Sequence, residues 1–458
     1  MARGKKKESP TPEERLQAAL VPESEQPYKV PGNWCWTQLG TYIDFATDYV
    51  ANGSFASLKQ NVAYYKEENY AILVKTQDFS NSFTEDLTYT DKRGYDFLKK
   101  SVLYGGELIL SNIGSIGKVF RVPHLNKPMT LAPNSIMIKC YRETDYDLLY
   151  YYFLSPFGTE QLYSITTGTA VKKFNKTDLK AICLPLPPLS EQQRIVDRIE
   201  SLFSKLDEAK QKAQEALDSF EIRKAAILHK AFTGELTAQW RKEHGVGMES
   251  WEKSRFDEVA TIKSNLVNPL DFPDLPHIAP DNIEKKTGVL LEYHTVSEDG
   301  VTSGKHRFYP GQILYSKIRP YLSKVVVVNF NGLCSADMYP IEAKGNARCL
   351  WYYMLSEEFL EQASSAGSRS VLPKINQKEL SALTVVLPTL KDEQEEIVRI
   401  LDDLFSKEQQ AKEAAEGVLE QIDLIKKAIL ARAFRGELGT NDPTEENAVE
   451  LLKALFEA

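Results

Sequence analysis

Cysteine is scarce in this chain of 458 residues, and its five copies stand far apart, as Cys35, Cys140, Cys183, Cys334 and Cys349. They form no closely spaced pair, which excludes a CxxC metal motif and argues against a disulfide framework. We therefore expect a reducing compartment, the cytoplasm. The six histidines never stand four residues apart, so no helical zinc motif is expected either.

Long apolar runs are missing as well. A membrane-spanning helix needs about 18 consecutive apolar residues, and the sequence has no such run. The start, MARGKKKESPTPEER, is basic but lacks the apolar stretch of a secretory signal. Hydrophobic residues make up 42% and charged residues 26%, which is typical of a globular protein. The length exceeds one ordinary hydrophobic core, so two or more domains are expected.

Catalytic signatures are also absent. A methyltransferase would show a glycine-rich cofactor loop and an Asn/Asp-Pro-Pro-aromatic motif, and an ATP-driven motor would show GxxxxGK[ST]. The string GSIGKV is too short for the latter. Asp337, Glu342 and Lys344 imitate a nuclease triad that could hold magnesium. Such short triads are frequent by chance, and the N-terminal half of the chain has no equivalent. We expect no catalytic residue and no metal site in this chain.

The net charge of −8 is unevenly distributed. Residues 34–183 hold 16 Lys and Arg against 15 Asp and Glu, and residues 251–386 hold 15 against 16. Residues 388–458 hold 9 against 17, a balance of −8 by themselves. The two large central segments are therefore close to neutral, and an overall acidic charge does not exclude a nucleic-acid partner.

One phrase occurs twice, as KAAILHKAFTGEL at 224–236 and KKAILARAFRGEL at 426–438. At the constant offset of 202, residues 195–236 and 397–438 share 19 identities in 42 positions. This period is far longer than that of a solenoid repeat. The sequence therefore contains an internal duplication, in which each copy is about half of the protein.

Each copy has the pattern of a long helix. Apolar residues recur in alternating steps of four and three, from Ile195 to Phe220 in the first copy and from Ile397 to Ile429 in the second, where Glu408 interrupts. Gly234 and Gly436 follow the last apolar residues and suit the left-handed conformation that ends a helix. The many alanines favour packing of the two helices together, as a coiled coil, over packing on separate neighbours. The spacing alone leaves a parallel or an antiparallel pair open.

The segments ahead of the two helices are mixed α/β in pattern. Strand-like runs include ELILSN, KVFRV, SIMIKC, QILYSK and KVVVVNF, and helical patterns occur at 145–163 and 349–364. These segments match each other weakly, for example where Asn175 aligns with Asn376. The duplication has thus kept the helices similar and let the globular heads diverge, which suits two heads with different targets.

The order of these features resembles the specificity subunit of type I restriction–modification enzymes. The resemblance rests on LPPLSEQQRIV, FSKLDEAK and AILHKAFTGELTAQW in the first copy, and on LPTLKDEQEEIV and AILARAFRGEL in the second. It covers nearly the whole chain; the helical motifs and their order are specific, whereas the heads match only in general layout.

The resemblance implies a mixed α/β fold with an internal pseudo-twofold repeat. Two target-recognition domains would be separated by two long conserved helices that form an antiparallel coiled coil. The expected boundaries are an N-terminal tail at 1–30, the first target-recognition domain at 31–186, a central conserved helical region at 187–240, the second target-recognition domain at 241–387, a distal conserved helical region at 388–438 and a C-terminal tail at 439–458.

The resemblance also implies a function and partners. Each domain would read one half of a split sequence in double-stranded DNA, and the helices would space the domains and dock two modification subunits and, through them, restriction subunits. This chain would carry no cofactor. S-adenosylmethionine, ATP and magnesium would belong to the partner subunits, and Phe232 and Phe434 near the helix ends would serve docking.

Side chains that suit DNA contact gather in loops at matching places in the two heads. Arg and Lys can read guanine, Asn and Gln can read adenine, and Lys, Arg and small polar groups can bind phosphate. The candidates are Lys75, Gln77, Asn81, Asn112, Ser115, Lys118, Lys172, Lys173 and Lys176 in the first head, and His277, Asp281, Asn282, Lys317, Arg319, Tyr321, Lys324, Ser368, Arg369 and Lys374 in the second. For each residue alone, a solvated surface role is at least as plausible.

Two alternatives stay open at this point. The N-terminal tail can form a helix with Thr11 as N-cap and Pro12 in its first turn, or a solvated arm. The rival to DNA recognition is a two-headed coiled-coil scaffold that binds only proteins.

Overall fold

The computed structural model describes residues 11–141, 144–367 and 373–457. The chain divides into two compact units. Unit 1 comprises residues 1–211 and 418–458, and unit 2 comprises residues 212–417. Within the described part of the chain, no helix combines the length and apolarity needed to cross a bilayer. Ser368 and Arg369, two of the predicted DNA contacts, lie outside the described residues.

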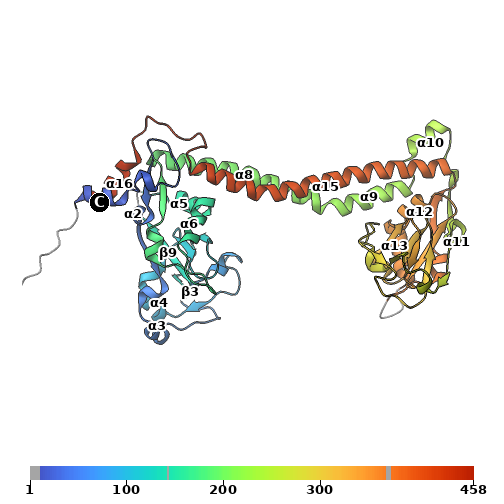
Figure 1. Ribbon diagram of the computed structural model, residues 1–458, viewed down its shortest axis with the longest axis horizontal. Helices are drawn as coiled ribbons and strands as arrows, with labels where there is room; N and C mark the ends of the chain where they lie inside the picture. Colours follow the sequence, from blue (N-terminus) through green and yellow to red (C-terminus); the bar gives the residue numbers. More distant parts are fainter. Residues whose placement is uncertain (1–10, 142–143, 368–372, 458) are drawn as a thin grey trace, which may run out of the picture. The chain divides into compact units, whose positions relative to one another are not determined.

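The head of unit 1 contains two four-stranded sheets and one strand pair, with short helices around them (Figure 1). The first sheet has the strand order β2-β9-β6-β7, the second has the order β4-β3-β8-β5, and β1 pairs with β10. The strands are β1 (Cys35–Gln38), β2 (Ile43–Asp48), β3 (Ala71–Val74), β4 (Tyr89–Thr90), β5 (Val102–Leu103), β6 (Leu108–Ser111), β7 (Val119–Arg121), β8 (Met129–Leu131), β9 (Ser135–Cys140) and β10 (Cys183–Leu186). The helices are α2 (Leu39–Tyr42), α3 (Phe55–Asn61), α4 (Lys92–Phe97), α5 (Tyr146–Leu154), α6 (Pro156–Ser164) and α7 (Lys176–Lys180).

The head of unit 2 repeats this plan. Its sheets have the orders β12-β20-β17-β18 and β13-β16-β19-β14-β15, and β11 pairs with β21. The strands are β11 (Trp251–Arg255), β12 (Ala260–Ile262), β13 (Leu266–Val267), β14 (Pro276–Ile278), β15 (His294–Thr295), β16 (Lys305–Phe308), β17 (Ile313–Ser316), β18 (Val325–Val327), β19 (Gly332–Cys334), β20 (Met338–Ala343) and β21 (Thr384–Pro388). The helices are α10 (Ala238–His244), α11 (Phe256–Val259), α12 (Ala347–Met354), α13 (Glu357–Ala366) and α14 (Gln377–Ser381).

The two heads share their topology strand by strand. In the first sheet, β2, β9, β6 and β7 correspond to β12, β20, β17 and β18, and all pairs are antiparallel. In the second sheet, the parallel pair β3–β8 corresponds to the parallel pair β14–β19. The head of unit 2 adds β13 at the edge of this sheet. The duplication therefore extends through both heads, although their sequences have diverged.

The helical patterns at 145–163 and 349–364 each form two helices rather than one. Ser155 ends α5 and caps α6, because its hydroxyl accepts from the amide of Gly158. Ser356 caps α13 in the same way, two residues after α12 ends at Met354, with the amide of Phe359 as the donor. A serine that caps the following helix satisfies an amide that would otherwise lack a partner, which fixes the bend.

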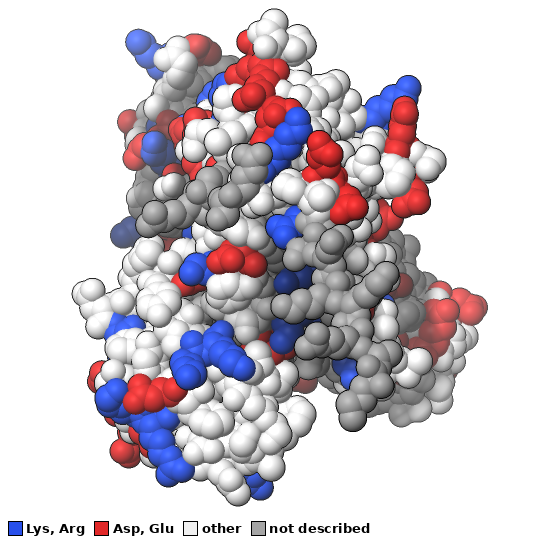
Figure 2. Space-filling view, turned by 90° about the vertical axis from the view of Figure 1, so that its left-hand side faces the viewer, with Lys and Arg blue, Asp and Glu red and all other residues white. Residues whose placement is uncertain are grey.

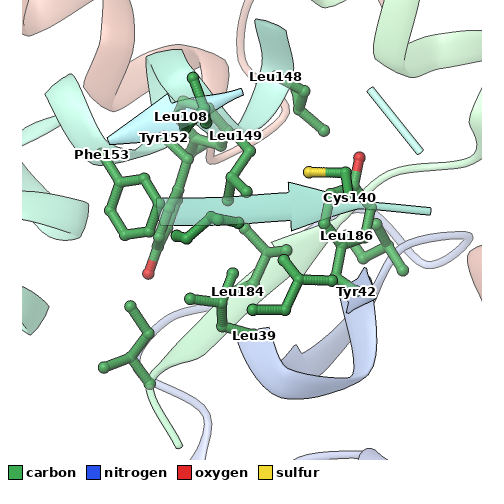
Figure 3. Close-up of a cluster of buried hydrophobic side chains, with 14 of the residues drawn as sticks. Leu39, Tyr42, Leu108, Cys140, Leu148, Leu149, Tyr152, Phe153, Leu184 and Leu186 are labelled. Carbon is green, nitrogen blue, oxygen red and sulfur yellow. The ribbon is translucent and has the colours of Figure 1, made fainter. Parts of the chain in front are cut away.

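The main core of unit 1 lies between its first sheet, the helices α5 and α6 and the two long helices. Figure 3 shows part of it, including Tyr42, Tyr152 and Phe153, which are all fully buried. The pKa values of Tyr42 and Tyr152 are raised well above the ordinary value by burial, so both hydroxyls remain neutral.

The long helices pack in antiparallel fashion within each unit. The long helices are α8 (Leu189–Asp218), α9 (Phe220–Phe232) and α15 (Lys391–Ala433). In unit 1, Asp207 of α8 pairs with Lys426 of α15 at 2.6 Å. Ile195, near the start of α8, shares a core with Leu430, near the end of α15. Residues early in one helix thus meet residues late in the other, which confirms the antiparallel arrangement (Figure 1).

Unit 2 contains the same antiparallel pairing, formed by α9 and the first part of α15. Arg223 pairs with Glu408 at 2.8 Å, and the Lys412 ammonium lies 5.2 Å from the centre of the Phe220 ring. Glu408, which interrupts the apolar register, is thus held by an ion pair. The first copy of the long helix is not continuous, because α8 ends at Asp218 and α9 begins at Phe220.

The apolar stripe predicted to join the two long helices is only partly buried. Ile397, Leu401, Ala415 and Ile422 are buried, but Ala411 lies exposed between them and Val418 and Ile425 are about 40% exposed. A two-helix pair covers one narrow stripe of each helix, so alternate apolar positions at its margin face solvent.

Both tails contain helices that belong to unit 1. The N-terminal tail forms α1 (Pro12–Ala19), with Thr11 as N-cap in a capping box with Glu14, as one of the two alternatives predicted. The C-terminal tail forms α16 (Ala448–Glu457), which packs against α1. Asn33 binds both Asp442 and Ala448 through backbone groups of the tail. The tail thus contributes to the core of unit 1.

A buried glutamate fixes the start of each long helix. Glu191 accepts from the indole of Trp34 and from Thr440 and Asn441. Glu393 accepts from the indole of Trp251 at 3.0 Å and from Arg241 and Thr237. Each head therefore uses its leading tryptophan to hold the helix that follows it.

Candidate nucleic-acid interface

Three loops meet at one edge of the first sheet in unit 1. Loop A (residues 112–118) connects β6 to β7, loop B (residues 171–175) precedes α7, and loop C (residues 132–134) precedes β9. The amide of Gly114 donates to Lys172 and the amide of Phe174 donates to Asn112, which joins loops A and B. The amide of Asn112 donates to Asn134, which joins loops A and C.

Unit 2 has the same three loops with the same connections. Loop A is residues 317–324, loop B is residues 373–376 and loop C is residues 335–337. The amide of Arg319 donates to Pro373 at 2.7 Å, and the amide of Ile375 donates to Lys317. The amide of Lys317 donates to Asp337 at 3.0 Å. The stretches that form loops A and B are thus neighbours in space within each head, which the sequence did not predict.

Loop A has two positions with left-handed backbone in each unit. In unit 1 they are Gly114 and Gly117, with φ of 80° and 86°. In unit 2 they are Arg319 and Ser323, with φ of 48° and 45°. A residue with a side chain is strained in this conformation, and such strain is common at functional sites. Arg319 is exposed and presents its guanidinium from this loop.

The predicted residues of unit 1 fall into two groups. Ser115, Lys118, Lys172 and Lys173 on loops A and B are exposed, as is Gln77 after β3. The others have partners within the unit. Lys176 pairs with Asp48 at 2.9 Å, Lys75 binds Thr88, Asn112 donates to Phe174, and Asn81 closes a turn with Glu85.

The predicted residues of unit 2 divide in the same way. Arg319, Tyr321, Lys374 and Asp281 are exposed, although Lys374 pairs with Asp337 and Asp281 lies 3.4 Å from Lys324. Lys317 donates to Ala336, Lys324 donates to Pro280, and Asn282 donates to Glu292. His277 is 5% exposed and its Nδ1 lies 2.7 Å from Asp299, so its ring is a structural group and its burial argues against direct contact with DNA.

Loop C was not predicted to be part of the surface. Asn134 and Asp337 occupy the same place in the two units. Asp337 was singled out only as part of a nuclease-like triad, and neither residue stands in a lysine-rich or glycine-rich stretch. The left-handed φ of 72° at Asn134 is compatible with a Pro-Asn turn, which is the one signal the sequence offers.

A cavity of about 520 Å³ lies beside loops A and C in unit 1. Phe55 is 81% exposed and Tyr64 52% exposed at its rim. The remaining lining residues are Asp48, Tyr49, Val50, Leu58, Lys59, Val62, Asn112, Ile113, Pro133, Asn134 and Ser135. An aromatic hollow next to exposed lysines suits contact with nucleic acid.

Figure 2 shows acidic side chains over much of the upper part of the view, and basic and acidic side chains side by side in its lower part.

Phe232 and Phe434 are core residues of their own units. Phe232 is 6% exposed and packs on Tyr353, and Phe434 is 1% exposed and packs on Tyr152. Docking of partner subunits on these two side chains stays a prediction, and their burial argues against direct contact.

The three residues that imitate a nuclease triad do not share one site, because each side chain pairs with a different residue. Asp337 pairs with Lys374 at 2.8 Å, Glu342 pairs with Lys263, and Lys344 donates to the carbonyl of Asp257. Among the described residues, no group of three or more His, Cys, Asp and Glu side chains is placed to hold a metal ion.

Comparison with solved structures supports this fold. The HsdS subunit from Thermoanaerobacter tengcongensis aligns over 90% of this chain and 100% of its own, with a TM-score of 0.62 and 21% identity. A chain from a study of complex assembly and conformational transition of the type I R-M system aligns to the same extent, with a TM-score of 0.60. The predicted mixed α/β fold with two heads and two long helices is confirmed.

Comparison of sequences identifies the family. The EcoDI specificity subunit of Escherichia coli is 40% identical over 292 residues, which cover 59% of this chain and 66% of that relative, just under two thirds of its length. The EcoKI specificity subunit of Escherichia coli (strain K12) is 23% identical over 83% of this chain and 85% of its own. These relatives are specificity subunits, in agreement with the prediction of a non-catalytic chain. The family model for the type I restriction modification DNA specificity domain matches twice, at residues 50–217 and 248–417, and the chain therefore belongs to this family.

Proposed function

We propose that this chain recognises a bipartite sequence in double-stranded DNA, with one half read by each unit. The observation that supports the proposal is the repeated arrangement of loops A, B and C. The backbone connections are the same in both units, whereas the side chains differ. A constant frame with variable side chains is what two readers of different sequences require.

The exposed side chains of the loops have the chemistry for this task. Arg319 offers the fork of donors that pairs with guanine, and Tyr321 offers a ring and a hydroxyl. Lys118, Lys172 and Lys173 in unit 1 suit phosphates. Contacts of both kinds are needed, because phosphate contacts position the protein and base contacts supply the sequence preference.

The chain would act within a larger complex. We propose two modification subunits as direct partners, with restriction subunits joined through them. S-adenosylmethionine, ATP and magnesium would be bound by those partners. The long helices would space the two heads and provide the docking surface.

The proposal is tested by sequencing the methylated bases of the host genome with and without this gene. We expect one bipartite motif to lose its methylation when the gene is removed. The purified chain, assembled with its modification subunits, should bind a duplex with that motif, and binding should weaken steeply with salt. An unchanged methylation pattern would count against the proposal.

The alternative is a two-headed scaffold that binds only proteins. It predicts an assembled complex with no affinity for duplex DNA at low salt. A gel-shift series on random and motif-containing duplexes, run with and without the modification subunits, distinguishes the two functions.

A further inference from the structure

Asp337 stands where the three loops of unit 2 meet. Its carboxylate lies 2.8 Å from the ammonium of Lys374 on loop B and 3.9 Å from the ammonium of Lys317 on loop A. Its backbone carbonyl accepts from the amide of Lys317, and its amide donates to Ser335. One carboxylate thus connects both lysines that face this junction from loops A and B.

The equivalent junction in unit 1 carries different charges. Asn112 occupies the place of Lys317, because both amides donate to loop C, and Asn134 occupies the place of Asp337. Lys173 occupies the place of Lys374, because each pairs with the isoleucine of loop A. The junction therefore reads Asn, Asn and Lys in unit 1, and Lys, Asp and Lys in unit 2. The net charge is +1 in both, so the additional lysine of unit 2 is matched by an additional carboxylate.

A contribution to the stability of the fold does not explain why a carboxylate stands at this junction. The side chains of Lys374 and Asp337 are 46% and 44% exposed, and ion pairs between exposed groups contribute little to stability. Lys317 is more buried, with 19% of its side chain exposed. Burial and the neighbouring Lys374 both lower the pKa of Lys317, whereas Asp337 raises it. Asp337 thus favours the charged form of Lys317 and holds the two ammonium groups at one place.

We propose that Asp337 is a specificity-determining residue that occupies, in the absence of DNA, the place of a DNA phosphate between Lys317 and Lys374. This inference rests on the proposed function. A carboxylate at this place competes with phosphates of any sequence, because it offers the same lysines an anionic oxygen. Only a duplex that also makes base contacts displaces it. The carboxylate therefore reduces non-specific binding more than specific binding.

The test compares Asp337→Asn with the wild type in the full chain assembled with its modification subunits. Dissociation constants are measured on a random duplex and on the duplex with the methylated motif, over a series of salt concentrations. Each additional phosphate neutralised steepens the logarithmic salt dependence by about 0.9. If the two proteins bind the random duplex alike near 1 M salt, the variant should bind it about eightfold more tightly near 0.1 M. Its preference for the motif should fall.

Two matched variants separate this role from a general effect of charge. Glu342→Gln removes one carboxylate from the same unit, where it pairs with Lys263 away from the loops, and should bind DNA like the wild type. The double variant Asp337→Asn with Lys317→Asn restores the net charge of +1 and should return the random-duplex affinity to that of the wild type.

Several outcomes contradict the inference. Unchanged random-duplex affinity in Asp337→Asn, or an equal gain in Glu342→Gln, overturns it. Loss of motif binding with no gain on random DNA would show instead that Asp337 accepts from a base. If the wild type binds neither duplex, the proposed function fails and this inference fails with it. Circular dichroism establishes that each variant is folded.

Discussion

At the scale of single residues, the buried polar groups define where the units are least tolerant of change. Glu393 is fully buried and accepts from the guanidinium of Arg241 at 2.7 Å, with Trp251 and Thr237 as further donors. Because Arg241 is also buried, each charge depends on the other for its solvation.

Replacing Glu393 with alanine should destabilise unit 2 strongly. The change leaves a buried guanidinium without its carboxylate, which costs about 3–5 kcal/mol. Urea unfolding followed by tryptophan fluorescence measures this, because Trp251 is one of the donors to Glu393. Glu395→Ala on the exposed face of the same helix serves as the control and should change stability by less than about 0.5 kcal/mol. Equal effects of the two substitutions would contradict the structural role of Glu393.

His306 should make the stability of unit 2 depend on pH. Burial lowers the pKa of this ring, and the charge of Lys317 lowers it further. The unfolded chain binds the proton near pH 6.5, whereas the folded chain does so only at lower pH, so stability is lost as pH falls below about 6.5. The loss per pH unit is at most about 1.4 kcal/mol for one group.

The measurement is the urea midpoint between pH 7.5 and 5 for the wild type and for His306→Asn. We expect a smaller decline in the variant. His277 and His294 near Asp299 are present in both proteins, so the difference between the two curves isolates His306. Parallel curves would show that His306 does not titrate in this range.

At the scale of elements, the sequence predicted the regular parts well because their periodicity is local. Strands β6, β9 and β17 and the helix α15 lie where the alternating or four-three patterns placed them. The break between α8 and α9 at Ser219 leaves that pattern intact, so the sequence did not reveal it.

The loops of the candidate interface were predicted only in part, because the contacts between them are not local in the sequence. Loops A and B contain glycine, lysine and arginine in recognisable strings at matching places of the duplicated chain, but their contact with each other was not predicted. Loop C has no distinctive composition. It is held beside loop A only by backbone hydrogen bonds that form once the sheet has formed. The burial of His277 and the internal partner of Lys176 depend on residues remote in sequence, Asp299 and Asp48. These contacts are set by tertiary structure, and no local pattern encodes them.

The antiparallel pairing permits a direct test of the helices as a spacer. Asp207 lies opposite Lys426, so the residues near Ala209 lie opposite those near Asp423. Seven residues inserted after Ala209 and seven after Asp423 should lengthen the helix pair by about 10 Å while keeping its apolar register. We expect the methylated motif of the host to gain about three base pairs between its half-sites. A motif of unchanged length in a folded double-insertion variant would exclude the spacer role.

At the scale of the whole molecule, two units with the same loop frame should act as independent readers. Arg319→Ala in unit 2 should relax the sequence preference of one half-site, at a cost of about 1–3 kcal/mol if the guanidinium reads a base. If it contacts phosphate, affinity should fall evenly across sequences and the salt slope should shrink by about one. Lys118→Ala in unit 1 should act only on the other half-site.

Binding to a library of duplexes randomised in each half-site in turn measures these preferences. The control is the wild-type complex on the same libraries. Should either substitution alter the preference in both half-sites, the heads would have to form one composite surface, and the model of two readers would be wrong.

The two units differ in one respect that bears on how the protein is made. Unit 2 is continuous in sequence, whereas the core of unit 1 includes Leu430, Phe434, Leu452 and Leu455 from the end of the chain. During synthesis the first head leaves the ribosome before unit 2, but the residues that complete its core leave after unit 2. We therefore expect unit 2 to finish folding before unit 1. Until then Ile195 and Ile199 remain exposed to solvent and prone to aggregation, because the C-terminal residues that bury them are missing. A chain that ends at residue 417 and has been released from the ribosome should accordingly resist protease over unit 2 and be cleaved within α8 of unit 1.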